Sequence, residues 1–203
     1  MAYTQCNDID KLCPENCDEQ QLPEILFDDC SPETNKSEIE WVVVGKSNSK
    51  AFKDIEDIEE WNTRLALPLK DTDSLRILRV SGDKPAAEDA TMVISGQREV
   101  VTDGTHTLNY DIDETNKVNY EFVRRTNCGG TYRFWYITIA GLIYGGNCGL
   151  KGQMKARLVQ ERGDGAIEKY TGSLRWKDKF DPPRATWPLA GMTKFPTPSD
   201  TNP

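Results

Sequence analysis

The fragment Gly45-Lys46-Ser47 is the part of this sequence that comes closest to an enzyme motif. A phosphate-binding loop also follows a β-strand and ends in Gly-Lys-Ser, because the backbone N–H groups of its glycines wrap the phosphate. The full motif needs another glycine five positions before Gly45, where this chain has Glu40. It also needs a helix that begins at the lysine, whereas polar residues 47–50 follow here. The fragment therefore predicts a plain turn.

The single histidine, His106, lies in a predicted strand, and the sequence contains neither a GxSxG nor an HExxH motif. One histidine cannot form a metal site that needs several histidines. Without a GxSxG motif it does not indicate a serine hydrolase either. About half of the carboxylates lie near the N-terminus or on one predicted helix, where contact with water is the usual reason for a charged side chain. We therefore expect no catalytic residues, no cofactor and no enzymatic activity, and we interpret His106 as a half-buried sheet residue.

The six cysteines form two sets. The first set lies in the N-terminal segment and is a candidate metal set: Cys6, Cys13, Cys17 and Cys30. Its spacing does not match a tight CxxC zinc knuckle, so zinc, disulfides and free thiols all stay open. The second set, Cys128 and Cys148, flanks a predicted hairpin, where the two residues are candidates for a cross-strand disulfide.

The most unusual segment is this glycine-bounded hairpin, which is rich in aromatic residues. Because successive side chains of a strand point to opposite faces, its three consecutive aromatic residues cannot all face one side. At least one should face outward and need a partner, which a neighbouring subunit would supply. The candidates for this oligomer contact are Phe134, Trp135, Tyr136 and Tyr144.

The charge of the chain is concentrated at its N-terminus. The chain has 203 residues and a net charge of -8, and residues 1–40 hold eleven acids against two lysines. This segment carries -9 and the rest about +1, so the balance disfavours a protein that binds nucleic acid by neutralising phosphates. Its composition predicts an acidic arm that is flexible alone. The chain does not start with the pattern of a secretory signal, and no run approaches the roughly 20 apolar residues of a membrane-spanning helix.

The pattern of apolar residues predicts a mainly β fold: an antiparallel β-sandwich or barrel with one flanking α-helix and extended N- and C-terminal arms. The helix is expected over 54–66, with Asp54 as its N-cap. We divide the chain into an acidic Cys-containing arm (1–39), a β-sandwich or barrel domain (40–183) and a Pro-rich tail (184–203) that docks on a neighbour or stays loose. The expected strands are 40–45, 74–80, 91–101, 105–113, 132–139, 142–144, 153–160 and 167–176.

Over residues 40–190 the order of these elements resembles virion structural proteins of phages that infect Bacteroidetes. The similarity is carried by the acidic helix ending in Trp61-Asn62, by YRFWY at 132–136 and by WKxxxDPP at 176–183. Within that group the chain resembles tail tube or tail-ring proteins, including those of crAss-like phages. The resemblance implies a β-sandwich or barrel assembled into rings whose inner wall faces DNA, with no catalytic residues.

These observations together predict a phage virion structural protein, a subunit of a tail tube or of a neck or tail ring that conducts DNA. Its expected partners are further copies of itself and other tail or neck proteins, with at most passive contact with DNA and none with a membrane. It would be assembled in the host cytoplasm and reside in the virion. The alternative is a capsid decoration protein, a head-tail connector or a host-glycan binding module, and an enzyme is a third, less favoured class.

Overall fold

The fold is mainly β, as the sequence predicts. The computed structural model describes residues 34–94, 98–163, 165–192 and 195–196. Its nine strands belong to one antiparallel sheet, and it has two short helices, neither long and apolar enough to cross a membrane within these ranges. The elements are β1 (Ile39–Lys46), α1 (Ile58–Ala66), β2 (Leu75–Asp83), β3 (Glu88–Ile94), β4 (Arg98–Ile112), α2 (Lys117–Asn127), β5 (Tyr132–Thr138), β6 (Leu142–Tyr144), β7 (Leu150–Val159), β8 (Lys169–Asp178) and β9 (Arg184–Thr186).

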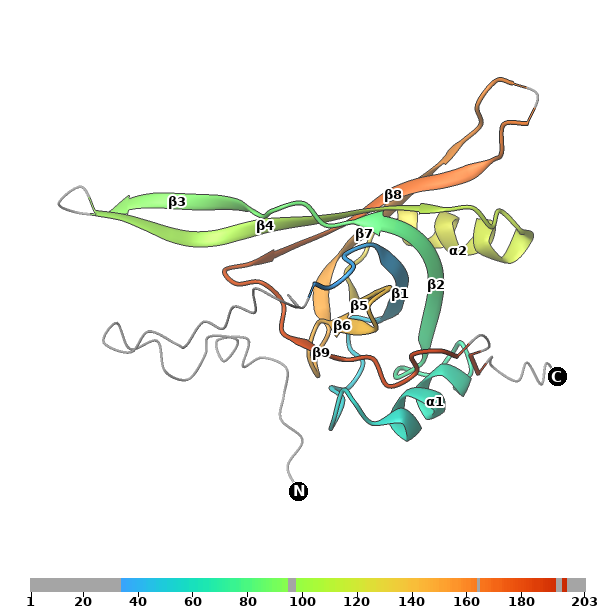
Figure 1. Ribbon diagram of the computed structural model, residues 1–203, viewed down its shortest axis with the longest axis horizontal. Coiled ribbons are helices and arrows are strands. Elements are labelled where there is room, and N and C mark those ends of the chain that lie inside the picture. The colour runs from blue at the N-terminus through green and yellow to red at the C-terminus, as the bar shows by residue number, and fades with distance from the viewer. Residues whose placement is uncertain (1–33, 95–97, 164, 193–194, 197–203) are drawn as a thin grey trace.

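Six of the strands curl into a near-ring. Their order is β1-β2-β4-β8-β7-β5, and β5 pairs back with β1 (Figure 1). The seam between β2 and β4 is short, running only from Ser81↔Asp111 to Asp83↔Asn109. Strands β6 and β9 extend the sheet beyond one half of β5, and β3 pairs with the outer half of β4. Ring closure leaves few open strand edges on the body itself.

The inside of the near-ring is filled by a first apolar cluster. It is built from inward-facing side chains that alternate along the strands, as in the regular in-and-out pattern of β7. Its largest buried members come from strands far apart in the sequence: Leu108, Tyr110, Phe134, Met154, Tyr170, Leu174 and Trp176. The ring is therefore a packed core rather than a pore.

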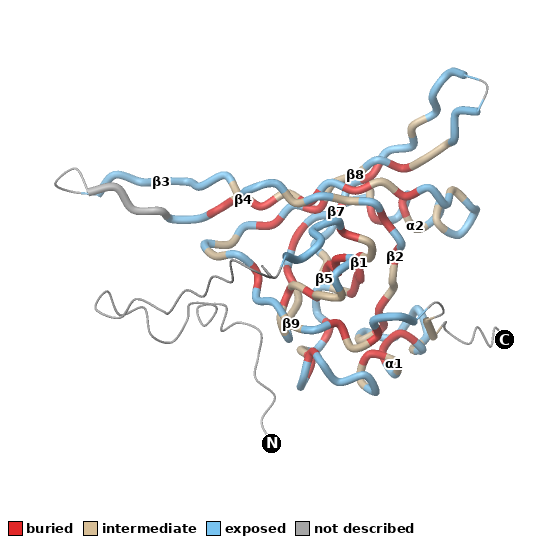
Figure 2. The backbone as a smooth tube through the Cα atoms, in the orientation of Figure 1, coloured by how far each residue is buried: buried red, intermediate tan, exposed pale blue. Residues whose placement is uncertain are grey.

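A second apolar cluster covers the outer face of β1 and β5. It includes Trp61 and Leu65 of α1, and Trp187 and Leu189 from the segment that follows β9. Residues 187 and 189 belong to the stretch that the sequence assigns to the Pro-rich tail, and they pack on the chain's own sheet. Figure 2 shows that the backbone of both β5 and α1 carries buried residues.

The N-cap of helix α1 lies three residues after the predicted one. Asp57 is the N-cap, and its carboxylate accepts hydrogen bonds from the backbone N–H groups of Glu59 and Glu60. Asp54 instead accepts from the Glu56 N–H group in the preceding turn. Both aspartates can form such turns, and the start of the helix is decided by where Trp61 and Leu65 reach the second cluster.

The expectation of a single flanking helix is wrong, because α2 is a second one. Asn116 caps it by accepting from the Asn119 N–H group. Its end is held to β7 by the Asn127 side-chain amide, which donates to the Ala156 carbonyl at 2.7 Å and accepts from the Ala156 N–H group at 3.1 Å. The helix buries only Val123 and Thr126, and its sequence is more polar overall than that of α1, so it does not stand out from a polar loop.

The predicted strand at 91–101 is also wrong. Strand β3 ends at Ile94, β4 begins at Arg98, and the two pair antiparallel with Ile94 opposite Arg98. Strand β4 then continues through Asp103 and Gly104, which lie between the predicted strands 91–101 and 105–113. Gly104 fits there because a Cβ atom would lie 2.8 Å from the Asp178 carbonyl oxygen of the adjacent β8.

Trp135 is the residue whose loss should damage the fold most clearly. Its side chain is fully buried (0% exposed) in the second cluster, and its indole N–H group donates to the Gly146 carbonyl at 2.8 Å. We expect Trp135→Ser to lower the free energy of unfolding by about 4 kcal/mol. Urea denaturation followed by far-UV circular dichroism measures this change.

Tyr120→Ser on the exposed face of α2 is the matched control, and it should change stability by less than about 1 kcal/mol. A Trp135→Ser protein as stable as the control would contradict the burial of this side chain.

Candidate functional site

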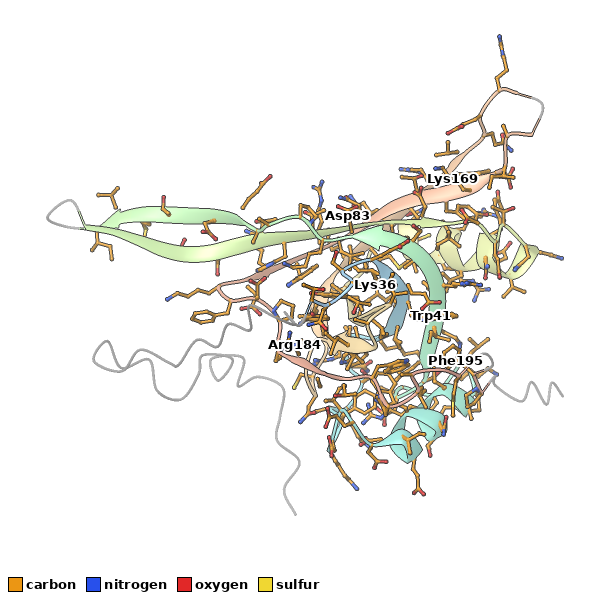
Figure 3. All side chains as sticks on the ribbon, in the orientation of Figure 1. Lys36, Trp41, Asp83, Lys169, Arg184 and Phe195 are labelled. Atoms are coloured by element: carbon orange, nitrogen blue, oxygen red, sulfur yellow. The ribbon has the colours of Figure 1, made fainter. Side chains whose placement is uncertain are left out.

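A cavity of about 670 Å³ lies at one end of the near-ring, and we call it the mouth cavity. Its walls come from the approach to β1, the end of β2, strands β5 and β6, and the segment before β9. Strand register brings these segments together, since Ile39 lies opposite both Gly82 and Thr138. Its volume is within the range of about 300–1,000 Å³ that is usual for small-molecule sites. Figure 3 labels three residues that border it: Lys36, Asp83 and Arg184.

Two stacked tyrosines form one wall of the mouth cavity. Tyr136 and Tyr144 are paired across β5 and β6, with ring centroids 4.8 Å apart and ring planes within 7° of parallel. Burial raises the pKa of the Tyr136 hydroxyl well above its ordinary value, and Tyr144 and Asp181 nearby raise it further. Tyr136 therefore stays a neutral hydrogen-bonding group. Tyr144 is only half-buried and offers aromatic surface to the cavity.

Next to this stack, Thr138 lines the mouth cavity with a side chain that is only 6% exposed. Its hydroxyl oxygen has no hydrogen-bond partner among the described residues. A buried hydroxyl without a partner costs stability, so such a group often indicates a site that another molecule satisfies.

An ion pair sits on another wall. The Lys84 ammonium lies 2.9 Å from a carboxylate oxygen of Asp181, and the Lys84 side chain is largely buried. The hydrogen bond from Lys84 lowers the pKa of Asp181 below its ordinary value. The Nδ1 atom of His106 lies 3.9 Å from the same carboxylate, while its ring stacks on Trp176 with centroids 5.0 Å apart. His106 is fully buried rather than half-buried.

The charged groups around the mouth cavity balance one another. Three cationic side chains, Lys36, Lys84 and Arg184, face three carboxylates, Glu38, Asp83 and Asp181. Together with the tyrosines, this arrangement can donate and accept many hydrogen bonds beside an aromatic surface. Such a set of groups can hold a ligand that carries several hydroxyl groups.

The aromatic hairpin does not provide the outward contact that the sequence suggests. Phe134 and Tyr136 are buried in the first cluster, and Trp135 is buried in the second. The inference that one of the three must face outward is wrong because β5 is covered on both faces by its own chain. Only Tyr144 of the four candidates is partly exposed.

The candidate disulfide between Cys128 and Cys148 is not formed. Cys128 is exposed at the C-cap of α2, and its thiol donates to the Arg124 carbonyl at 3.4 Å. The outer half of β5 pairs with β7, with Tyr132 opposite Gly152, so Cys148 lies in the connection between β6 and β7 and is not brought opposite Cys128.

The other four cysteines, and with them the zinc and disulfide hypotheses for the arm, lie outside the described residues. In the part of the chain that the structure describes, no group of three or more His, Cys, Asp or Glu side chains could hold a metal ion.

A second surface, missed from the sequence, is the two-stranded ribbon formed by β3 and the outer half of β4. It projects away from the body, and every residue of β3 is exposed (Figures 1 and 2). Three consecutive apolar side chains are exposed near its end: Met92, Val93 and Ile94. Gly96, between two β-branched runs, is the sequence signal of a hairpin that could have revealed it.

Comparison with known protein families, with curated proteins and with solved structures finds no match to this chain. The interpretation of both surfaces therefore rests on their own chemistry.

The ion pair at the mouth cavity predicts a pH-dependent contribution to stability. The lowered pKa of Asp181 means that the pair stabilises the fold above the ordinary aspartate pKa of about 3.9, and that this is lost as the pH falls through the folded value. Because the Asp181 side chain is 80% exposed, we expect Asp181→Asn to cost under about 1 kcal/mol at pH 7.

Urea denaturation at pH 7 and at pH 3 measures the difference between wild type and variant, which should shrink at the lower pH. Asp89→Asn on the exposed β3 is the control. An equal difference at both pH values would show that the interaction is not ionic.

Proposed function

We propose that this chain is a phage virion structural protein that assembles with copies of itself into a ring or tube of the tail or neck. The observation that carries the proposal is the projecting β3–β4 ribbon. The resemblance of residues 40–190 to tail tube and tail-ring proteins supports the same assignment. Other tail or neck proteins are its expected further partners, and the virion is its expected location.

The ribbon has the properties of a subunit contact. A two-stranded hairpin is at best marginally stable in water, and β3 pairs with no strand except β4 among the described residues. Its unpaired edge and its exposed Met92, Val93 and Ile94 suit pairing with another chain. When one copy gives its ribbon and accepts its neighbour's at a different surface, the contact is heterologous, and it forms a ring when the rotation between neighbours closes.

Any path for DNA would lie between subunits, because the first cluster fills the inside of each near-ring. The chain after the acidic N-terminal segment carries a net charge of only about +1, so it offers little phosphate-neutralising charge. A wall that attracts DNA weakly lets it slide, which is what a passive conduit requires. We therefore propose no enzymatic role and no tight DNA binding.

Assembly should depend on the apolar end of the ribbon. We expect Val93→Asp to abolish rings or tubes, because it places a charge on a side chain that is 70% exposed in the single chain and buried in the contact. Negative-stain images and native mass spectrometry of the full chain measure assembly, and circular dichroism checks the fold.

Val118→Asp is the matched control, since Val118 is 77% exposed and lies in the first turn of α2, where an acid is tolerated. The proposal fails if the wild-type chain is monomeric at assembly concentrations. It also loses its main support if Val93→Asp assembles as the wild type does.

Duplex DNA should bind weakly to the assembled protein. The densest basic groups are Arg124 with Arg125 and Lys177 with Lys179, and such small patches lose affinity at physiological salt. A filter-binding assay at about 150 mM salt should retain no duplex. Tight, salt-resistant retention would favour a DNA-binding protein instead of a passive conduit.

A further inference from the structure

We propose that the mouth cavity binds a neutral carbohydrate, with room for a short oligosaccharide. This inference is independent of the proposed assembly, because every residue that lines the cavity comes from one chain. It rests on three properties of the cavity: its balance of charges, its aromatic wall and its buried hydroxyl without a partner.

The balance of charges selects against ions. An anion entering the cavity would meet the carboxylates of Glu38, Asp83 and Asp181, and a cation would meet an equal number of positive side chains. One of those cations, Lys84, is already paired with Asp181 at 2.9 Å. A ligand with no net charge avoids both repulsions and can use both kinds of group.

Sugar hydroxyls suit such a wall because each one donates one hydrogen bond and accepts others. Carboxylates accept from them, while the Lys36 ammonium and the Arg184 guanidinium donate to them. The buried Thr138 hydroxyl would gain the partner that it lacks among the described residues. A ligand with several hydroxyl groups therefore matches the lining better than an apolar ligand does.

The aromatic wall gives the apolar part of the site. A pyranose ring has C–H groups on its faces, and these pack on the surface of an aromatic side chain. Tyr144 is half-buried and borders the cavity, and its stacking on Tyr136 fixes its orientation. Tyr136 is in turn held in the first cluster, so the wall is set before a ligand arrives.

The strand ladder also holds the cavity in shape. Tyr144 lies opposite both Tyr136 and Arg184, and Ile39 lies opposite both Gly82 and Thr138. Backbone pairing thus fixes the residues that the strands contribute, while Lys36, Lys84 and Asp181 reach the cavity from the segments beside the strands. The aromatic wall, which lies on paired strands, loses little entropy when a ligand binds.

The full-length protein can be tested on an array of neutral oligosaccharides built from hexoses and N-acetylhexosamines, followed by calorimetric titration of the strongest binder. We expect saturable binding that is about tenfold weaker in Tyr144→Leu, which removes the aromatic face. Arg184→Gln, at an exposed position, should also weaken binding, and it is the test variant if Tyr144→Leu does not fold. Tyr120→Leu on α2, outside the cavity lining, is the matched control and should bind as the wild type does.

The proposal is overturned if no neutral oligosaccharide binds at millimolar concentration. It is also overturned if the bound sugar is insensitive to both cavity variants, or if inorganic phosphate binds in preference to every sugar. Failure of the chain to form rings would count against the proposed assembly alone. A ring-forming protein that binds no sugar would count against this inference alone.

Discussion

The structure depends on the burial of β5 on both of its faces. One face closes the near-ring over the first cluster through Phe134 and Tyr136, and the other carries the second cluster through Trp135 and Ile137. Strand β1 shares this position, with Val42 and Val43 in different clusters. Both strands must therefore be apolar at consecutive positions, which a sheet with one face in water does not require.

This constraint explains where the rest of the molecule lies. Helix α1 and the segment after β9 pack on the outer face because Trp135 and its neighbours need a cover there. Strand β9 is then held against β6, which places Arg184 beside Tyr144. The mouth cavity follows from the same arrangement, since it forms where the covered face ends and the near-ring opens to water.

The two surfaces proposed for function differ in how firmly the rest of the chain holds them. The mouth cavity is bounded in part by strands of the closed body, so its two tyrosines keep fixed positions. The β3–β4 ribbon stands outside both clusters and is fully exposed along β3, so it gains most from a partner. A subunit with a rigid body and a projecting ribbon can hold a ligand within itself while its contacts with neighbours form and repeat.

The sequence by itself determined the β class, most strand positions and the existence of α1, because alternation and β-branched runs report local geometry directly. It could not reveal α2, which buries only Val123 and Thr126, and it misled on Trp135. The sequence of three consecutive aromatic residues does not say whether the second face of the strand is covered by a neighbouring subunit or by the chain's own helix. Only the tertiary structure decided that question, because the cover for β5 comes from residues about 70 positions before it and 50 after it. The mouth cavity, assembled by register between distant strands, was beyond local patterns for the same reason.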